Sequence, residues 1–443
     1  MRSMTTASMQ WHKAAITSLG VLCFALAVAR AQPTYTRDHL ITALDVVTDA
    51  AGNSYVAGWT EGTVGDASFG KSDMFVAKYG PDGERQWIQQ FGTAGWDDTK
   101  AVVTNSPEEI TLITNSTGYT LTPGYSWGMA MVRLAQSGRP ISIEPIETMT
   151  GYGITFSNDD HLYLAAFIHA DSDRDLDAPV IVKLSYSGTV EWERSLIVGD
   201  EIRHPYHLDW DTSGFITVAG NAHTAPKITH PDQLWGFIAR LTTDGQIQWN
   251  RAFPEPIEDI ASNDVGTSYI TGGGFFRLLD AEEEPYESND RGVSASAFLA
   301  SFDADGNTRW IKQFGGYHSY WGRGVAVDAT GNVIVVGYGN GNIGGEPLGA
   351  SDAFVIKYTQ DGDRLWADRL GTPEFDRALA VTTDHQGNVY VAGFLGETWE
   401  DHNHHNGVSN DAGNRAFLVK YSPDGQQLWL RTLSNHTDTP TEN

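Results

Sequence analysis

Two residues with the chemistry of a general base and its carboxylate partner occupy one recurring position of the chain. His207 and Asp259 hold this position in two consecutive copies of a repeat, and Asp45 holds it in the first copy. The remaining copies have small residues there, namely Ala101, Gly153, Gly324 and Ala380. A carboxylate beside an imidazole orients the ring and raises its proton affinity, as a general base requires. The structural alternative for the same pair is a hydrogen bond that lines a water-filled channel.

Polar and aromatic side chains gather in the segments before this position, which we expect to be loops between successive repeats. The catalytic candidates are His207, Tyr206, Asp259 and Arg323, and the ligand-binding candidates are Trp96, Asp97, Lys100, Tyr152, His204, Glu258, His318, Tyr320, Trp321, Asp376 and Arg377. Side chains that combine aromatic rings with charged groups are typical of sites that recognise a polar ligand. We therefore expect these residues to share one face of the molecule.

Two kinds of carbohydrate chemistry are compatible with these residue types. A polysaccharide lyase needs a His/Tyr pair as base and acid and a cation to neutralise a uronate carboxylate. Those types are supplied by His207, Tyr206, Tyr152, Lys100 and Arg323. A glycoside hydrolase needs two carboxylates at a set separation, and the candidates are Asp97, Glu258, Asp259 and Asp376. No sequence motif selects either enzyme.

Two further clusters have the composition of metal sites. Carboxylates alternate along one loop at Asp171, Asp173, Asp175 and Asp177, as in a calcium loop, but the usual glycine and closing glutamate are missing. A solvated acidic loop is the alternative. His402 and His404 lie two residues apart and could share a transition metal, although no third ligand is evident. The sequence specifies no cofactor; calcium is the cofactor that we expect if the acidic loop binds a metal.

A repeat that fills the chain must position all of these candidates. Asp-Gly or Ser-Gly is followed, four residues after the glycine, by tryptophan, from Gly83 and Trp87 in the first copy to Gly425 and Trp429 in the last. An eroded copy has Ser142 in place of the tryptophan. Seven units of roughly 50 to 65 residues indicate a propeller or a solenoid.

Each unit contains four short runs of β-branched and aromatic residues bounded by turn glycines, which predict strands. In the sixth copy the first three runs are 324–328, 333–337 and 354–358, and the fourth surrounds Trp366. Four-stranded antiparallel sheets repeated radially form a β-propeller. We therefore predict an all-β fold, a seven-bladed β-propeller of four-stranded antiparallel blades over residues 43–433, with no blade shared between the termini.

The repeat resembles that of the bacterial seven-bladed β-propeller repeat family, the SBBP repeat. Its pattern is Asp-x-x-Gly-Asn-x-Tyr-Val-x-Gly, followed by Asp-x-Phe-Val-x-Lys-Tyr-x-x-Asp-Gly-x-x-x-Trp. The sixth copy matches this pattern at Asp328, Gly331, Asn332, Asp352, Phe354, Lys357, Tyr358, Asp361, Gly362 and Trp366. The resemblance implies the propeller fold and a secreted or surface bacterial protein. It implies little about chemistry, because the motif residues are scaffold.

The N-terminal segment predicts export. Residues 1–31 have Arg2 and Lys13 before an apolar stretch and end in a small-x-small pattern, as in a cleaved signal peptide. A lead at 32–42 and a polar tail at 434–443 flank the propeller. We expect a periplasmic or extracellular monomer whose mature chain has no membrane span. The formal net charge of −27 repels phosphate backbones and anionic lipid, so nucleic acid is excluded as a partner.

Loop lengths indicate which face has a function. The connection between the second and third strands spans 59–74 in the first copy, but 273–297 in the fifth and 394–416 in the seventh. These loops and the loops between blades share one face, because successive strands alternate in direction. We expect an exported, non-catalytic binding or scaffold protein that recognises a glycan or a protein partner there. The alternative is a carbohydrate-active enzyme, a polysaccharide lyase or glycoside hydrolase, on the same face.

Overall fold

The computed structural model describes residues 40–65, 67–104, 109–118, 128–146, 149–157, 161–168, 178–196, 201–224, 236–274, 295–314, 319–397 and 414–434. These residues form seven sheets of four strands each. The first sheet consists of β1 (Ile41–Thr48), β2 (Ser54–Thr60), β3 (Asp73–Tyr79) and β4 (Arg85–Phe91), and the second of β5 (Asp97–Thr104), β6 (Glu109–Ser116), β7 (Gly128–Ala135) and β8 (Pro140–Ile146). The third consists of β9 (Met149–Phe156), β10 (His161–Ile168), β11 (Ala178–Ser185) and β12 (Val190–Ser195). The fourth and fifth consist of β13 (Glu201–Asp211), β14 (Phe215–Thr224), β15 (Gly236–Thr242) and β16 (Ile247–Phe253); and β17 (Ile257–Ser262), β18 (Ser268–Gly274), β19 (Ser296–Phe302) and β20 (Thr308–Phe314). The last two consist of β21 (Tyr320–Val327), β22 (Val333–Gly339), β23 (Asp352–Tyr358) and β24 (Arg364–Leu370); and β25 (Phe375–Thr383), β26 (Val389–Glu397), β27 (Arg415–Tyr421) and β28 (Gln427–Leu433).

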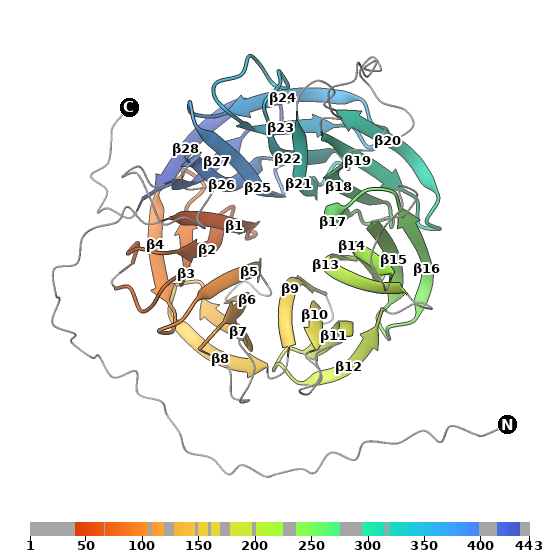
Figure 1. Cartoon of the computed structure of the whole chain (residues 1–443), viewed down its shortest axis with the longest axis horizontal. Helices are drawn as coiled ribbons and strands as arrows, with labels where there is room; N and C mark the ends of the chain where they lie inside the picture. The colour runs from red at the N-terminus through yellow and green to blue at the C-terminus, as the bar shows by residue number, and fades with distance from the viewer. Residues whose placement is uncertain are drawn as a thin grey trace, which may run out of the picture. The chain divides into compact units, whose positions relative to one another are not determined.

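The seven sheets are the blades of a propeller, and each is built from four consecutive strands in simple antiparallel order. Figure 1 shows the first strand of every blade around the centre of the ring and the fourth strand at its edge. No strand joins a blade from elsewhere in the described parts of the chain, so the blade number and order predicted from the sequence are confirmed.

The recurrent tryptophan joins each blade to the next. The ring of Trp429 covers Gly83, where an added Cβ would lie 2.8 Å from the indole, and Trp429 Nε1 donates a hydrogen bond to the carbonyl oxygen of Pro81 at 3.1 Å. Gly83 has φ +82°, a conformation that glycine adopts without strain. This contact closes the ring between the last and first blades. The second blade has Ser142 in place of the tryptophan, and there the side chains of Glu144 and Met131 cover Gly188 of the third blade.

The recurrent lysine is also part of the scaffold. Lys357 Nζ lies 2.8 Å from Asp328 Oδ2, and both side chains are almost fully buried. Lys357 also donates to the carbonyl oxygen of Pro423 in the next blade. Because isolated buried charges are very costly, the pairing with a carboxylate is what permits a lysine at this depth.

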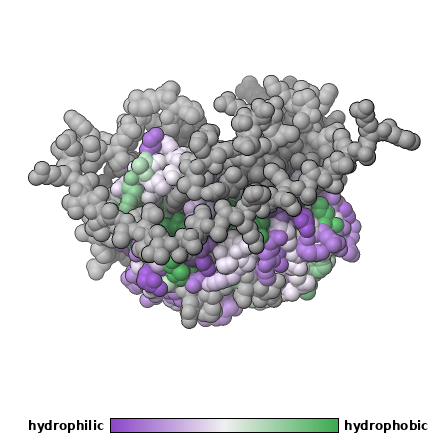
Figure 2. Space-filling view, turned by 90° about the horizontal axis from the view of Figure 1, so that it is seen from below, coloured by the Kyte–Doolittle hydropathy of each residue, from purple (hydrophilic) through white to green (hydrophobic). Residues whose placement is uncertain are grey.

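On the side seen in Figure 2, the coloured part of the surface is largely hydrophilic, with separate hydrophobic spots. Exposed aliphatic residues on the outermost strands include Leu365 and Leu428, which are about half exposed. This surface is consistent with the large negative charge. Within the described ranges, no helix is long and apolar enough to cross a membrane.

The predicted strand limits are close to the observed ones except at the centre of the ring. The innermost strand of the sixth blade begins at Tyr320, four residues before the predicted start at Gly324. Residues 1–39 and 435–443 lie outside the described residues, so the signal peptide and the tail remain predictions.

Candidate functional site

Every innermost strand has a β-bulge at the same place. In β13 the pairing skips from Pro205 to His207, and in β17 it skips from Ile257 to Asp259, so that Tyr206 and Glu258 have no partner residue on the adjacent strand. The bulge residues of the seven blades are Leu44, Lys100, Tyr152, Tyr206, Glu258, Arg323 and Leu379. A bulge redirects a side chain and increases local twist, and bulges are frequent beside functional sites. Five of the seven redirected side chains are charged or aromatic.

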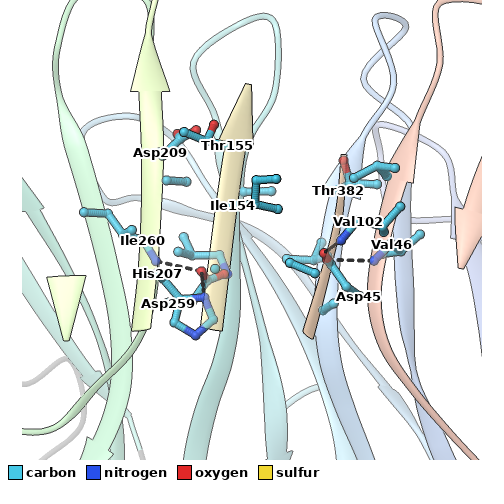
Figure 3. Close-up of a pocket in the computed structure, with 18 of the residues that line it drawn as sticks. Asp45, Val46, Val102, Ile154, Thr155, His207, Asp209, Asp259, Ile260 and Thr382 are labelled. Atoms are coloured by element: carbon cyan, nitrogen blue, oxygen red, sulfur yellow. Dashed lines mark hydrogen bonds and ion pairs between the residues drawn. The ribbon is translucent and has the colours of Figure 1, made fainter. Parts of the chain in front are cut away.

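The seven innermost strands line a central cavity of about 400 Å³. Its wall includes the bulge residues Lys100, Tyr152 and Arg323 and, one position later, His207 and Asp259. Figure 3 shows the His207 ring and the Asp259 carboxylate on one side of this channel and Asp45 on the opposite side. The recurring position that the sequence singled out therefore faces the channel.

The His207–Asp259 pair forms as predicted. His207 Nδ1 lies 3.2 Å from Asp259 Oδ1, and the two residues come from adjacent blades (Figure 3). The His207 side chain is 42% exposed, toward the channel. Burial lowers the pKa of His207, but the hydrogen bond and charge of Asp259 and the charge of Glu258 raise it by more, so the net shift is upward. The proton on the imidazole is therefore held more firmly than usual.

Asp259 also fastens two blades together. Its Oδ1 accepts the N–H of Ile260 in its own strand, and its Oδ2 accepts the N–H of Val325 in the sixth blade, both at 2.8 Å. Asp45 does the same between the first and second blades, where it accepts the N–H groups of Val46 and Val102. These carboxylates have a structural role as well as a place in the channel.

Asp209 is a third carboxylate of this kind, and the sequence did not single it out. It accepts the N–H groups of Trp210 and Ser262, and Ser262 belongs to the next blade. Burial raises the pKa values of Asp209 and Asp45 to about 7, although these hydrogen bonds lower them. Strand alternation could have identified Asp209, because it lies two residues after His207 and so faces the same side of β13.

The cationic bulge residues are each paired with an acid. Arg323 Nη1 lies 2.6 Å from Glu258 Oε2, and Lys100 Nζ lies 2.7 Å from Asp98 Oδ2. Arg323 and Lys100 remain partly exposed, at 36% and 30%. Both pairs therefore have polar atoms within reach of a ligand and little unbalanced positive charge.

An aromatic pair links the channel wall, which includes Tyr152, to the bulge residue Tyr206. The rings of Tyr152 and Tyr206 meet edge to face with centroids 5.3 Å apart. Burial, followed by Tyr152 and the charge of Glu258, raises the pKa of Tyr206. The Tyr206 hydroxyl is therefore neutral at physiological pH and can donate a hydrogen bond.

Asp97 and Asp376 are placed away from the channel surface. Both side chains are fully buried. Asp97 accepts hydrogen bonds from the N–H and the hydroxyl of Thr93, and Asp376 accepts the same pair of bonds from Thr372. Each carboxylate is thus enclosed by its own loop between blades, and neither is presented for the paired-carboxylate chemistry of a hydrolase.

Several other candidates pack around the loops. Tyr320 is almost fully buried, and its hydroxyl accepts the N–H of Ile343. Trp321 packs on Gly273, and Arg377 lies over the Tyr338 ring at 4.7 Å. In contrast, the indole of Trp96 is 42% exposed, with Lys71 Nζ 5.5 Å from the ring centroid.

Some predicted residues lie outside the described residues. They are His318, the acidic loop Asp171, Asp173, Asp175 and Asp177, and the histidines His402 and His404; for His204 only the backbone, in β13, is described. Among the described residues, no group of three or more His, Cys, Asp or Glu side chains could hold a metal ion. The two metal hypotheses remain predictions.

A comparison with protein families identifies the repeat in part of the chain. Residues 309–345 match the family model of the beta-propeller repeat SBBP, which confirms the resemblance noted in the sequence. An uncharacterized WD repeat-containing protein, L264, of Acanthamoeba polyphaga mimivirus is 25% identical over 152 residues, which are 30% of this chain and 11% of that protein. The chain therefore spans only a small part of this curated relative.

Three solved structures are among those that resemble this chain. The polysaccharide lyase Uly1 is 11% identical with a TM-score of 0.48, over 86% of this chain and 90% of that one. A protein of unknown function from Bacteroides caccae is 10% identical with a TM-score of 0.39, over 85% and 93%. The extracellular domain of the putative hybrid two-component system BT3049 from B. thetaiotaomicron is 12% identical with a TM-score of 0.42, over 87% and 47%.

Proposed function

We propose that this propeller is an exported, non-catalytic binding protein and that a neutral glycan is its ligand. The binding site is the end of the channel where the bulge residues lie. The observation that carries the proposal is the set of bulges, because they bring Lys100, Tyr152 and Arg323 to the wall of one cavity. The bulge residues Tyr206 and Glu258 contact two of these side chains, Tyr152 and Arg323. Without the bulges, every residue of an innermost strand would pair with the adjacent strand, so the bulges are not needed for strand pairing.

The residue types fit a saccharide. Sugars present hydroxyl groups, which hydrogen-bond to charged and amide side chains, and apolar ring faces, which pack on aromatic rings. Tyr152 and Tyr206 supply the aromatic surface, and the Arg323–Glu258 pair supplies donors and acceptors side by side. The cavity of about 400 Å³ is within the size range of small-ligand sites.

The charge balance favours a neutral ligand over an acidic one. Arg323 is already paired with Glu258, and Lys100 with Asp98. The channel wall also contains Asp259. A uronate carboxylate would have to compete with these acids for each cation, whereas a neutral sugar can bridge both partners of a pair.

One observation favours an enzyme as the second candidate. His207 is oriented by Asp259 at 3.2 Å, which is the arrangement of a general base. In this alternative, His207 Nε2 removes a proton from the substrate, the Tyr206 hydroxyl donates one to the leaving group, and Arg323 stabilises the developing charge. This role of Arg323 has a cost, because the ion pair between Arg323 and Glu258 would have to break before the guanidinium could bind the substrate.

A glycan array combined with a product assay tests the proposal. The full chain is applied to neutral and acidic glycans, alongside Tyr206→Ala and the control Val265→Ser, which changes an exposed residue of the β17–β18 turn. We expect binding to neutral glycans by the wild type and the control, reduced binding by Tyr206→Ala, and no cleavage product. Binding confined to acidic glycans, together with an unsaturated product, would support the lyase instead.

A further inference from the structure

Two exposed aromatic side chains lie at the junction of the first and second blades. Phe69 is 46% exposed and Trp96 is 42% exposed, and no other aromatic side chain among the described residues is as exposed as these two. Lys71 lies two residues after Phe69, and its Nζ is 5.5 Å from the centroid of the Trp96 ring. Exposed apolar groups that gather in one place mark binding surfaces more often than isolated ones do.

The two loops that carry these residues are held together by hydrogen bonds. The N–H of Lys71 donates to the carbonyl oxygen of Gly95 at 2.9 Å, and the next residue, Ser72, pairs with Trp96. Thr117 fixes Trp96 as well, because its hydroxyl accepts the N–H of Trp96 at 2.8 Å and its own N–H donates to the Trp96 carbonyl oxygen at 2.9 Å. The backbone beneath the indole is therefore ordered, and a ligand that stacks on Trp96 has little loop entropy to overcome.

One strand connects this surface to the channel. Trp96 directly precedes β5, the innermost strand that brings Lys100 to the channel wall. Burial alternates at the start of β5, so that Asp98 and Lys100 share its more exposed side, and the exposed Trp96 continues this alternation. At about 3.3 Å per residue, Lys100 and Trp96 are about 13 Å apart along the chain, which is more than one sugar ring can span.

The equivalent junction between the sixth and seventh blades lacks the cation and the indole. The bridge that holds Trp96 recurs there at Phe375. When the two junctions are aligned on this bridge, Ala350 stands in place of the lysine and Leu348 in place of the phenylalanine. The scaffold of this junction therefore forms without an exposed tryptophan or a lysine, so these two side chains of the first junction are not needed to build it.

We propose that Phe69, Lys71 and Trp96 form an outer subsite of the glycan site, and that the ligand is a neutral oligosaccharide extending from the channel along β5 to the indole. This inference rests on the proposed glycan binding. The apolar face of the outer sugar ring packs on Trp96. The Lys71 side chain is exposed, and no described carboxylate forms a salt bridge with it, so its ammonium group can donate hydrogen bonds to the sugar hydroxyls.

A length series of glycans tests the proposal. The full chain is titrated calorimetrically with neutral gluco-, manno- and galacto-oligosaccharides, each from the monosaccharide to the pentasaccharide. In the series that binds, affinity should rise with length by about tenfold or more, and Trp96→Ala should remove this rise without changing the affinity for the shortest member that binds. Lys71→Ala, which reproduces Ala350 of the equivalent junction, should weaken binding of the pentasaccharide by about threefold. The control Leu348→Ser changes the exposed leucine of the equivalent junction and should bind as the wild type does.

The outcomes separate this proposal from the proposed function. If Tyr206→Ala weakens binding at every length but Trp96→Ala weakens it at none, the channel site stands and the outer subsite is overturned. Equal losses for the shortest and longest glycans in Trp96→Ala would also overturn it, because the indole would then affect the whole site. If no glycan binds to the wild type, both proposals fail. The melting temperature of Trp96→Ala should match that of the wild type, since the side chain is 42% exposed.

Discussion

Nδ1 of His207 lies 3.2 Å from Oδ1 of Asp259, across the junction between the fourth and fifth blades. The same carboxylate accepts the N–H of Val325 in the sixth blade. One side chain therefore orients the imidazole that faces the channel and also joins two blades. For this reason, a change at Asp259 alters the site and the scaffold together, whereas a change at His207 can separate them.

Replacing His207 by alanine should weaken glycan binding by about tenfold, because it removes one hydrogen-bonding group worth about 1.4 kcal/mol. The melting temperature should change little, since the His207 side chain is 42% exposed. Asp259→Ala should lower both affinity and melting temperature. Isothermal titration and calorimetry on the two variants check this, and an unchanged affinity in His207→Ala would remove that residue from the site.

Acidification from pH 8 to pH 6 should raise the melting temperature. Asp45 and Asp209 have pKa values of about 7 in the folded protein, above the ordinary 3.8, so the folded state holds protons that the unfolded chain has released. Stability therefore falls as the pH rises toward 7. The raised pKa of His207 acts in the same direction, because the stability it contributes at low pH is lost as the pH rises through its folded value.

Scanning calorimetry across this pH range measures the effect, with Asp45→Asn as the variant that should show a shallower dependence. The depressed pKa values of Asp328 and Asp303 do not interfere, because those groups titrate below 3.8. A melting temperature that stays constant or increases between pH 6 and pH 8 would contradict the assignment of these carboxylates.

Gly83→Ala should destabilise the protein more than Gly214→Ala. Both glycines have positive φ, +82° and +89°, so alanine is strained at each by about 1–2 kcal/mol. An added Cβ at Gly83 would also lie 2.8 Å from the Trp429 ring, whereas nothing lies within 4 Å at Gly214. We expect a further cost of about 1–3 kcal/mol at Gly83, measured by urea denaturation. Equal costs would mean that Trp429 does not close the ring as described.

The repeat made the fold predictable, and the bulges made the site harder to predict. Glycine and tryptophan recur where a turn or a blade contact requires them, so blade number and order could be read from positions such as Gly83 and Trp429. A bulge inserts one residue and so interrupts the alternation of inward and outward side chains, which makes the start of a strand hard to recognise in the sequence. Tyr206 and Glu258 were therefore expected in loops, whereas the structure places them inside the innermost strands.

The enclosure of Asp97 could not be predicted for a similar reason. Its sequence context, between an exposed tryptophan and a lysine, is that of a surface loop. The N–H and hydroxyl of Thr93 fold back on its carboxylate and bury it. Local hydrogen bonds of this kind depend on backbone geometry that spacing alone does not reveal.

The affinity of the full chain for its array-selected neutral glycan, measured by isothermal titration, tests the central claim most directly. Tyr206→Ala should lower this affinity by about tenfold or more, since it removes an aromatic ring and a hydroxyl beside Tyr152 of the channel wall. Val265→Ser, at an exposed turn outside the channel lining, should bind as the wild type does. If Tyr206→Ala binds as tightly as the wild type, or if Val265→Ser shows the loss instead, the glycan does not bind at the bulge residues.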